Sequence, residues 1–225
     1  MPETTISIDS TRASRAGHTF HERWAARRAL QLVFPKDDLF AIAVEGLSSN
    51  ESAEPGVEAE DIADLVLYYG QGETFESCSA LETIQFKYKL TPKPVTSSYV
   101  KKTLKKFAAT VAGYEKKYSQ SIIVEKLSFS FVTNAKFSDH LTEAISCHKA
   151  GKIPDDKNAK KQFEHLDLWC KECKVDTRRL LSLIEFRAST KNLTAQNRLL
   201  RRALGNWSAG ADPQALMRLH ALAGL

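Results

Sequence analysis

Several features that would assign this chain to a common class are scarce or missing. Only 4 of its 225 residues are cysteines, and their scattered positions do not form a disulfide framework. No apolar run approaches the roughly 18 residues that a membrane span requires. The polar N-terminus contains no hydrophobic segment of the signal-peptide kind. The sequence therefore predicts a cytoplasmic protein with reduced thiols and no membrane partner.

Motifs for nucleotide binding and for nucleophilic catalysis are missing as well. Gly70 and Gly72 form a turn with no following lysine or helix, which excludes a P-loop. No serine or cysteine stands beside a recognisable base. Cys170 and Cys173 have zinc-like spacing with His165 nearby, but no second pair completes four ligands. A structural zinc site is therefore disfavoured.

The composition indicates a folded protein of the mixed α/β class. Hydrophobic residues make up 43% of the chain, enough for one sizeable core. The net charge of +5 is modest and indicates little by itself, so the placement of the charges matters more. Short segments rich in β-branched and aromatic residues alternate with segments of helical period, which predicts an α/β sheet with helices packed on it.

Periodicity divides the chain into elements. The expected helices are 16–33, 99–118, 137–150, 160–174, 177–183, 194–204 and 213–222, and the expected strands are 39–46, 63–69, 80–88 and 126–132. Ser97 or Ser98 is the expected cap of the second helix, and Asp176 that of the fifth. The short apolar piece 183–186 leaves open whether 184–187 forms an added strand.

Three regions follow from these elements. Residues 1–14 are expected to be a flexible lead-in, 15–150 a core, and 151–225 a mostly helical extension of the same domain. The polar, acidic stretch 48–61 contains Pro and Gly and is expected to be a mobile loop at the mouth of a site. Its carboxylates are more typical of a solvated charge run than of metal ligands, with Asp61 as the exception that stays open.

The most informative stretch is the expected hairpin of strands 63–69 and 80–88. Asp64 opens the first strand, where it could also simply cap a turn or accept backbone N–H bonds. Because side chains alternate along a strand, Gln85 and Lys87 point to one face of the second strand while Phe86 points to the other. A polar pair on an otherwise apolar strand is costly unless a function uses it. A solvated edge strand is the plain alternative.

Phosphate chemistry on a divalent ion would use these residues. Asp64 supplies a carboxylate oxygen, Gln85 an amide oxygen and Phe86 its backbone carbonyl, which suits Mg²⁺, with Mn²⁺ as a substitute. Lys87 would position or deprotonate the attacking water. One carboxylate is a weak site, so a further anion is expected.

Two glutamates are candidates for that anion. Glu45 follows the preceding strand and ranks first; Glu22 on the first helix ranks second, because it could equally pair with a neighbouring arginine. His18 and His21 lie near the same helix start and could touch phosphate, but histidines at such positions are usually structural or solvated.

A lysine cluster follows the pair of strands on the next expected helix. It consists of Lys101, Lys102, Lys105 and Lys106, which lie off the apolar stripe of that helix. Lysines on a solvated helix face are ordinary. Next to a phosphodiester site they would also form a phosphate track for nucleic acid, so both interpretations stay open.

The phrases Ile62–Leu67 and Ile84–Tyr88 resemble the paired motif of Mrr-type restriction enzymes, in the PD-(D/E)xK nuclease superfamily and its Q-x-K subgroup. Together with Arg15–Trp24 and Val44–Gly46, they resemble the N-terminal effector nuclease domain of bacterial anti-phage proteins of the CBASS and AVAST kinds. The resemblance covers roughly residues 15–135.

This resemblance implies a restriction-endonuclease-like core of helix, three-stranded β meander, helix and strand. It implies a Mg²⁺-dependent endonuclease that hydrolyses double-stranded DNA with little sequence specificity. It also implies an antiviral effector, fused to or activated by a sensor part, that oligomerises on activation. The alternatives are a catalytically inactive nuclease fold that binds DNA or a protein partner, and a nuclease that acts on RNA.

Overall fold

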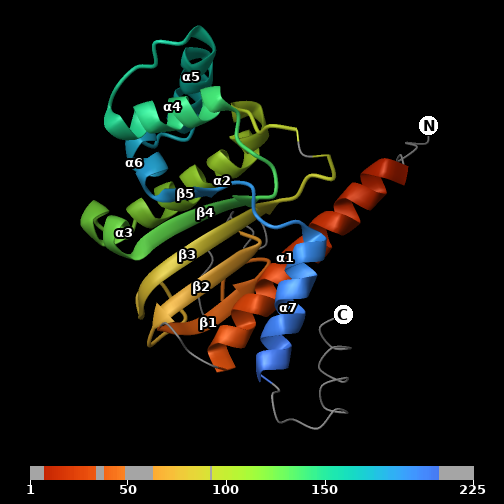
Figure 1. Cartoon of the computed structure of the whole chain (residues 1–225). Coiled ribbons are helices and arrows are strands. Elements are labelled where there is room, and N and C mark those ends of the chain that lie inside the picture. Colours follow the sequence, from red (N-terminus) through yellow and green to blue (C-terminus); the bar gives the residue numbers. More distant parts are fainter. Residues whose placement is uncertain (1–7, 34–37, 49–62, 92, 208–225) are drawn as a thin grey trace, which may run out of the picture.

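A five-stranded sheet forms the centre of the computed structural model, which describes residues 8–33, 38–48, 63–91 and 93–207 (Figure 1). In spatial order the strands are β1 (Leu39–Val44), β2 (Leu65–Gly70), β3 (Cys78–Lys87), β4 (Leu127–Thr133) and β5 (Ile184–Arg187). The first three pair antiparallel as a meander, and β4 and β5 then add in parallel. The predicted α/β class and the predicted hairpin are both confirmed.

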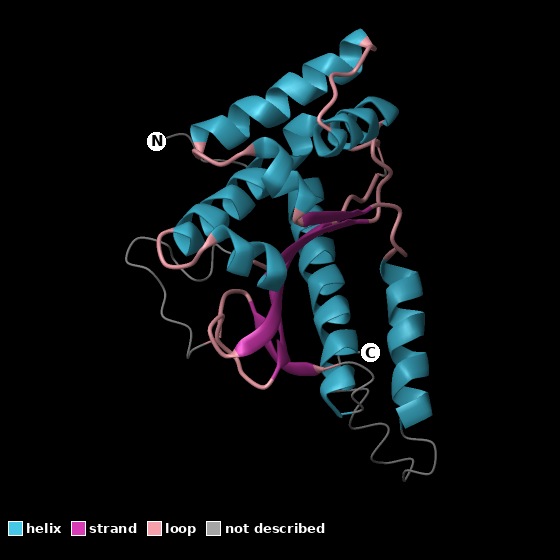
Figure 2. Cartoon of the chain, turned by 90° about the vertical axis from the view of Figure 1, so that its left-hand side faces the viewer, coloured by secondary structure: helices cyan, strands magenta, loops and turns pink. Residues whose placement is uncertain are grey.

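Helices cover both faces of this sheet. They are α1 (Ile8–Val33), α2 (Ser97–Glu115), α3 (Gln120–Lys126), α4 (Asp139–Ala150), α5 (Lys157–Glu172), α6 (Thr177–Ser182) and α7 (Leu193–Trp207). The helices α1 and α7 lie side by side on one face, while α2 covers the other and α4, α5 and α6 pack beyond it (Figures 1 and 2). None of the helices within the described ranges has the length and apolar character needed to cross a membrane.

The alternation along β3 divides the core into two parts. Leu81 belongs to the larger cluster, which lies between the sheet and α2. Ile84 and Phe86 belong to the smaller cluster on the side of α1, where the rings of Phe20 and Phe86 meet edge to face at 5.9 Å. Burial of apolar side chains on both faces fixes the register of β3. The direction of each polar side chain on this strand follows from that register.

Short-range sequence features predicted the ends of several helices correctly. Helix α4 ends at Gly151, whose φ of 68° is a left-handed conformation that glycine adopts without strain. Helix α6 begins after Asp176, which accepts a hydrogen bond from the N–H of Arg179 at 2.7 Å. The segment 184–187 is the added strand β5.

Three expectations need correction. Helix α1 begins at Ile8, so the end of the expected lead-in is helical; its Arg and Ala residues favour helix without showing an apolar period. The cap of α2 is Thr96. Ser97 lies inside that helix, where its N–H donates to Gln162 of α5 at 2.7 Å. The seven-residue helix α3 was not expected, because so short a segment carries little periodic signal.

The C-terminal part of the described chain completes the sheet. It contributes β5, which pairs with β4, and α7, which packs on α1. Within the described residues, the region 151–207 is mostly helical and contains the strand at 184–187 that the sequence left open. The expected helix 213–222 and the acidic stretch around Asp61 lie outside the described residues.

Candidate functional site

Asp64 is held at the point where β2 begins. Its N–H donates to the carbonyl of Ile84 at 3.1 Å, continuing the ladder of the hairpin by one residue. Its carboxylate Oδ2 accepts the N–H of Phe86 at 2.6 Å. The Phe86 N–H thus bonds to a side-chain oxygen of Asp64 instead of to a backbone carbonyl of the neighbouring strand. This bond to the backbone fixes the carboxylate beside the end of β3.

Gln85 and Lys87 share the face of β3 that carries Leu81, as their spacing predicted. The side chain of Gln85 is only 3% exposed. Its Oε1 has no hydrogen-bond partner among the described residues. A buried acceptor without a partner costs roughly 1–3 kcal/mol. The fold therefore carries an unsatisfied oxygen on the residue directly before Phe86, whose N–H bonds to Asp64.

The half-buried ammonium of Lys87 lies in a mixed electrostatic environment. Burial lowers its pKa, the charge of Asp64 raises it, and the charges of Lys106 and Lys102 lower it again. Each influence requires proximity. Lys87 is therefore within electrostatic range of both the Asp64 carboxylate and two lysines of α2.

Glu45, the first-ranked additional anion, is a neighbour of Asp64. Its N–H donates to the backbone carbonyl of Asp64 at 3.1 Å. Its φ of 56° is uncommon for a residue other than glycine. Its side chain is exposed, and its charge raises the pKa of His21. Glu45 thus belongs to the electrostatic environment of this site.

Glu22, the second candidate, is exposed on α1, and the residue before it faces the site instead. Nε2 of His21 lies 3.7 Å from Oδ2 of Asp64, and its ring packs on Phe86 with the centroids 5.2 Å apart. Burial lowers the pKa of His21, with Asp64 acting in the opposite direction. The position of His21 directly after the buried Phe20 was the signal that sequence reasoning did not use.

The four lysines of α2 divide into two pairs. The ammonium of Lys101 lies 5.3 Å from the ring centroid of Trp169, and Lys105 forms an ion pair with Glu172, so both are directed toward α5. Lys102 and Lys106 act on Lys87 instead. The i, i+4 spacing explains this division, because it places the two members of each pair on one helix face. Lys102 and Lys106 are therefore the pair whose charges reach Lys87.

A second polar cluster, the Glu82 network, lies on the opposite face of β3. Oε1 of Glu82 accepts from Ser130 Oγ at 2.6 Å and from Arg187 Nη2 at 3.1 Å. Oε2 accepts from the hydroxyl of Tyr69 at 3.3 Å, and Arg28 Nη2 lies 3.9 Å away. This network was not foreseen. It links β2, β3, β4, β5 and α1 and leaves neither carboxylate oxygen without a partner.

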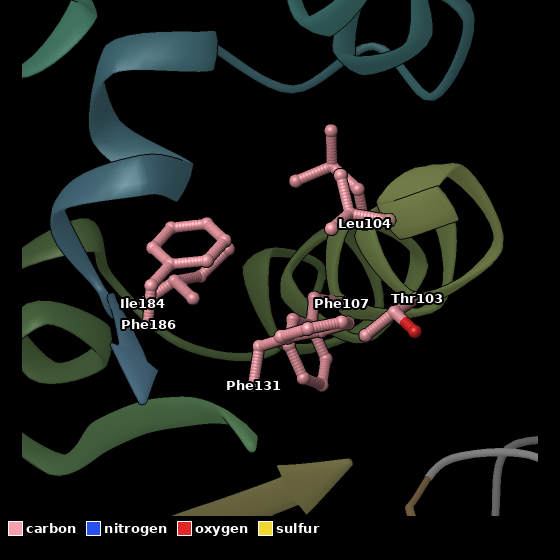
Figure 3. Close-up of a pocket in the computed structure, with 7 residues that line it drawn as sticks. Thr103, Leu104, Phe107, Phe131, Ile184 and Phe186 are labelled. Atoms are coloured by element: carbon pink, nitrogen blue, oxygen red, sulfur yellow. The ribbon is translucent and has the colours of Figure 1, made fainter. Parts of the chain in front are cut away.

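Two cavities differ from the candidate site. One of about 10 Å³ lies in the apolar core between α2 and β5 (Figure 3). It is lined by Val100, Thr103, Leu104, Phe107, Phe131, Ile184 and Phe186 and has room for a single water at most. The other, of about 440 Å³, opens at the edge of β4 and β5 beside the Glu82 network. Neither cavity is lined by Asp64, Gln85 or Lys87.

Metal binding by a larger group of side chains has little support. Within the part of the chain that the structure describes, no three His, Cys, Asp or Glu side chains are grouped to hold an ion. The thiols of Cys170 and Cys173 are free, and burial raises the pKa of Cys170 to about 12, which opposes zinc ligation. Any ion at the Asp64 site would therefore also need amide, carbonyl and water oxygens.

In comparisons with known proteins, no family model and no curated protein matches this chain. The residues of the site bring a carboxylate, an amide oxygen, an imidazole and an amine to the adjoining ends of two strands, with lysines nearby. This combination can bind a cation together with a phosphate group.

Proposed function

We propose that this protein is a metal-dependent endonuclease that hydrolyses double-stranded DNA with little sequence specificity, as an effector of anti-phage defence. The observation that carries the proposal is the cluster of Asp64, Gln85 and Lys87, in which a buried amide oxygen has no partner among the described residues. The element order of helix, β meander, helix and parallel strand supports a restriction-endonuclease-like core.

The donor set fits a hard divalent ion. Asp64 offers a carboxylate and Gln85 its unpartnered oxygen. The carbonyl of Phe86 should face the same side as its N–H, which bonds to Asp64, because both groups of a strand residue face one neighbour. Mg²⁺ or Mn²⁺ would be held by these oxygens, with the exposed Glu45 adding negative charge nearby rather than a direct ligand. When bound, the ion would supply positive charge for the phosphate and acidify a water.

The residues of the chain would perform the remaining steps. The Phe86 N–H holds the Asp64 carboxylate in place. Burial lowers the pKa of Lys87, which favours the neutral amine that can accept a proton from water. Lys102 and Lys106 would contact phosphate oxygens, which carry no sequence information. Contacts of this kind are consistent with cleavage of many DNA sequences.

Plasmid nicking tests this proposal. Lys87→Ala should cut at least about a hundredfold more slowly than the unchanged protein in Mg²⁺, and EDTA should abolish cutting by both. Lys89→Ala is the matched control on the same segment, since its ammonium donates to the carbonyl of Lys93 at 3.0 Å. Equal rates for Lys87→Ala and the unchanged protein, also in oligomerised form, would reject the enzyme. RNA offered beside DNA tests the substrate class.

One observation favours a second candidate, a catalytically inactive nuclease fold that binds DNA or a protein partner. No trio of carboxylate, imidazole or thiol side chains is grouped for a metal among the described residues. This candidate predicts DNA binding that depends on salt and is indifferent to EDTA, without any cutting. Binding alone therefore does not distinguish the two candidates, whereas nicking does.

A further inference from the structure

His21 and Asp64 are placed as two ligands of one ion would be. Nε2 and Oδ2 lie 3.7 Å apart, which is too long for a hydrogen bond. Two ligand atoms that are each about 2.1 Å from one metal ion lie roughly 3–4 Å from each other. Oδ2 already accepts the Phe86 N–H and has a second lone pair. The separation therefore leaves room for a cation between imidazole and carboxylate.

Packing fixes the direction of the imidazole. Its ring lies on Phe86, with an angle of 33° between the two rings. Phe86 is itself buried against Phe20 and Trp24 of α1. Because β3 and α1 are joined through this aromatic cluster, His21 approaches Asp64 from the side of α1. A ligand whose rotamer is locked by packing is preorganised for binding.

The third donor is an independent observation. Oε1 of Gln85 is buried and has no partner among the described residues. Gln85 follows Ile84, whose carbonyl bonds to the N–H of Asp64, so it lies beside Asp64 across the hairpin. Gln85 faces the α2 side of β3, so its oxygen would approach the ion of Asp64 from the face opposite to the imidazole.

We infer that His21 is a nitrogen ligand of the ion that Asp64 binds, so that the site prefers a transition ion such as Mn²⁺ to Mg²⁺. The inference deepens the proposed function and rests on it for the presence of the ion. The expected preference for Mn²⁺ follows from the type of ligand atom. Mg²⁺ favours an all-oxygen shell, whereas imidazole nitrogen binds first-row transition ions more strongly. His21 thereby sets which ion the site selects.

Metal binding without DNA tests this inference. Mn²⁺ is titrated into the full chain and followed by electron paramagnetic resonance, and Mg²⁺ is then added as a competitor. His21→Phe keeps the ring on Phe86 but removes the nitrogen, and His18→Phe is the matched control, since His18 is exposed one turn earlier. The unchanged protein and His18→Phe should both bind Mn²⁺ at least about tenfold more tightly than Mg²⁺.

His21→Phe should lower the Mn²⁺ affinity about tenfold or more and remove the nitrogen hyperfine coupling from the bound Mn²⁺ signal. A thermal melt confirms that this variant is folded. If folded His21→Phe binds Mn²⁺ as the unchanged protein does, or if no nitrogen coupling appears, His21 is not a ligand. Mg²⁺-dependent nicking that persists in that case would leave the proposed function standing. If the unchanged protein neither binds an ion nor cuts DNA, the proposed function itself fails.

Discussion

The polar side chains Glu82 and Gln85 lie on opposite faces of β3, and they differ in whether their oxygens have hydrogen-bond partners. On the α1 side, both oxygens of Glu82 have partners from neighbouring elements. On the other face, Gln85 is buried with an oxygen that has no partner among the described residues. At the adjoining end of the hairpin, His21 of α1 stands 3.7 Å from Asp64 without a hydrogen bond. We call the Glu82 network the closed cluster, because both carboxylate oxygens have partners. We call Asp64, Gln85 and His21 the open cluster, because they still offer atoms that could bind a cation.

This difference separates stability from function. A fully satisfied buried network rigidifies the sheet and fixes the position of β5. A buried acceptor without a partner lowers stability, so a fold that retains it is expected to use it. Charge alone would not have distinguished the two clusters, since both combine carboxylates with cations. The presence or absence of hydrogen-bond partners for their buried oxygens distinguishes them.

The largest expected effect is on the closed cluster. Glu82→Ala should lower the free energy of unfolding by roughly 3 kcal/mol, because it leaves the partly buried Arg187 and Ser130 without their shared acceptor. Glu185→Ala removes an exposed partner of the same Arg187 and should cost less than about 1 kcal/mol. Urea denaturation measures both. Equal losses for the two variants would show that the Glu82 network is not the stabilising one.

The open cluster should respond with the opposite sign. Gln85→Met removes a buried acceptor that lacks a partner, so the free energy of unfolding measured in EDTA should rise by about 1 kcal/mol. In Mg²⁺, the same substitution should abolish nicking. Gln196 is the matched control. It is also buried, but it accepts from Arg27 at 2.6 Å and donates to the carbonyl of Lys191 at 3.2 Å.

Gln196→Met should therefore lower the free energy of unfolding, by about 1 kcal/mol. Urea denaturation of both variants in the same buffer gives the comparison. Should Gln85→Met be destabilising to the same degree as Gln196→Met, the amide of Gln85 serves packing rather than a ligand.

The lysine pairs of α2 should differ in their effect on DNA binding. Replacing both Lys102 and Lys106 by Ala should reduce the slope of log affinity against log salt by about 2, because each phosphate contact contributes about 0.9. Replacing Lys101 and Lys105 by Ala should change the slope less, since these side chains are directed to Trp169 and Glu172. Fluorescence anisotropy in EDTA measures binding without cleavage. The same slope for both double variants would argue against a directed phosphate track.

The smallest expected effect is on the pH dependence of cleavage. The charges of Lys106 and Lys102 lower the pKa of Lys87, in addition to the larger effect of burial. Replacing both by Ala should therefore raise this pKa. If neutral Lys87 accepts the proton, the rising limb of the pH–rate profile should move to higher pH, and the Lys101 and Lys105 replacement should leave it in place. A shift to lower pH would contradict this role for Lys87.

Predictions from the sequence succeeded where short-range chemistry decides. The alternation of Ile84, Phe86 and their neighbours predicted the face of each side chain on β3, because a strand has a period of 2. Gly151 and Asp176 marked helix ends for reasons confined to one turn. The early start of α1 and the whole of α3 were missed, since helical propensity without an apolar stripe is a weak signal.

Most of the candidate site was likewise visible in the sequence, but its surroundings were not. Asp64, Gln85 and Lys87 could be chosen because they interrupt apolar strands. His21 could not be placed beside Asp64, since that contact depends on how α1 crosses the sheet. The separation of Lys102 and Lys106 from Lys101 and Lys105 depends equally on the position of α5.

By itself, the sequence determined the order of the strands along the chain, their inward and outward faces, and the presence of a carboxylate, an amide and an amine on one hairpin. Only the tertiary structure decided which polar groups have partners, which histidine faces the carboxylate and which lysines lie near Lys87. The physical reason is the distance along the chain over which each effect acts. Alternation and capping act between neighbouring residues, whereas the satisfaction of a buried polar atom depends on elements far apart in the chain.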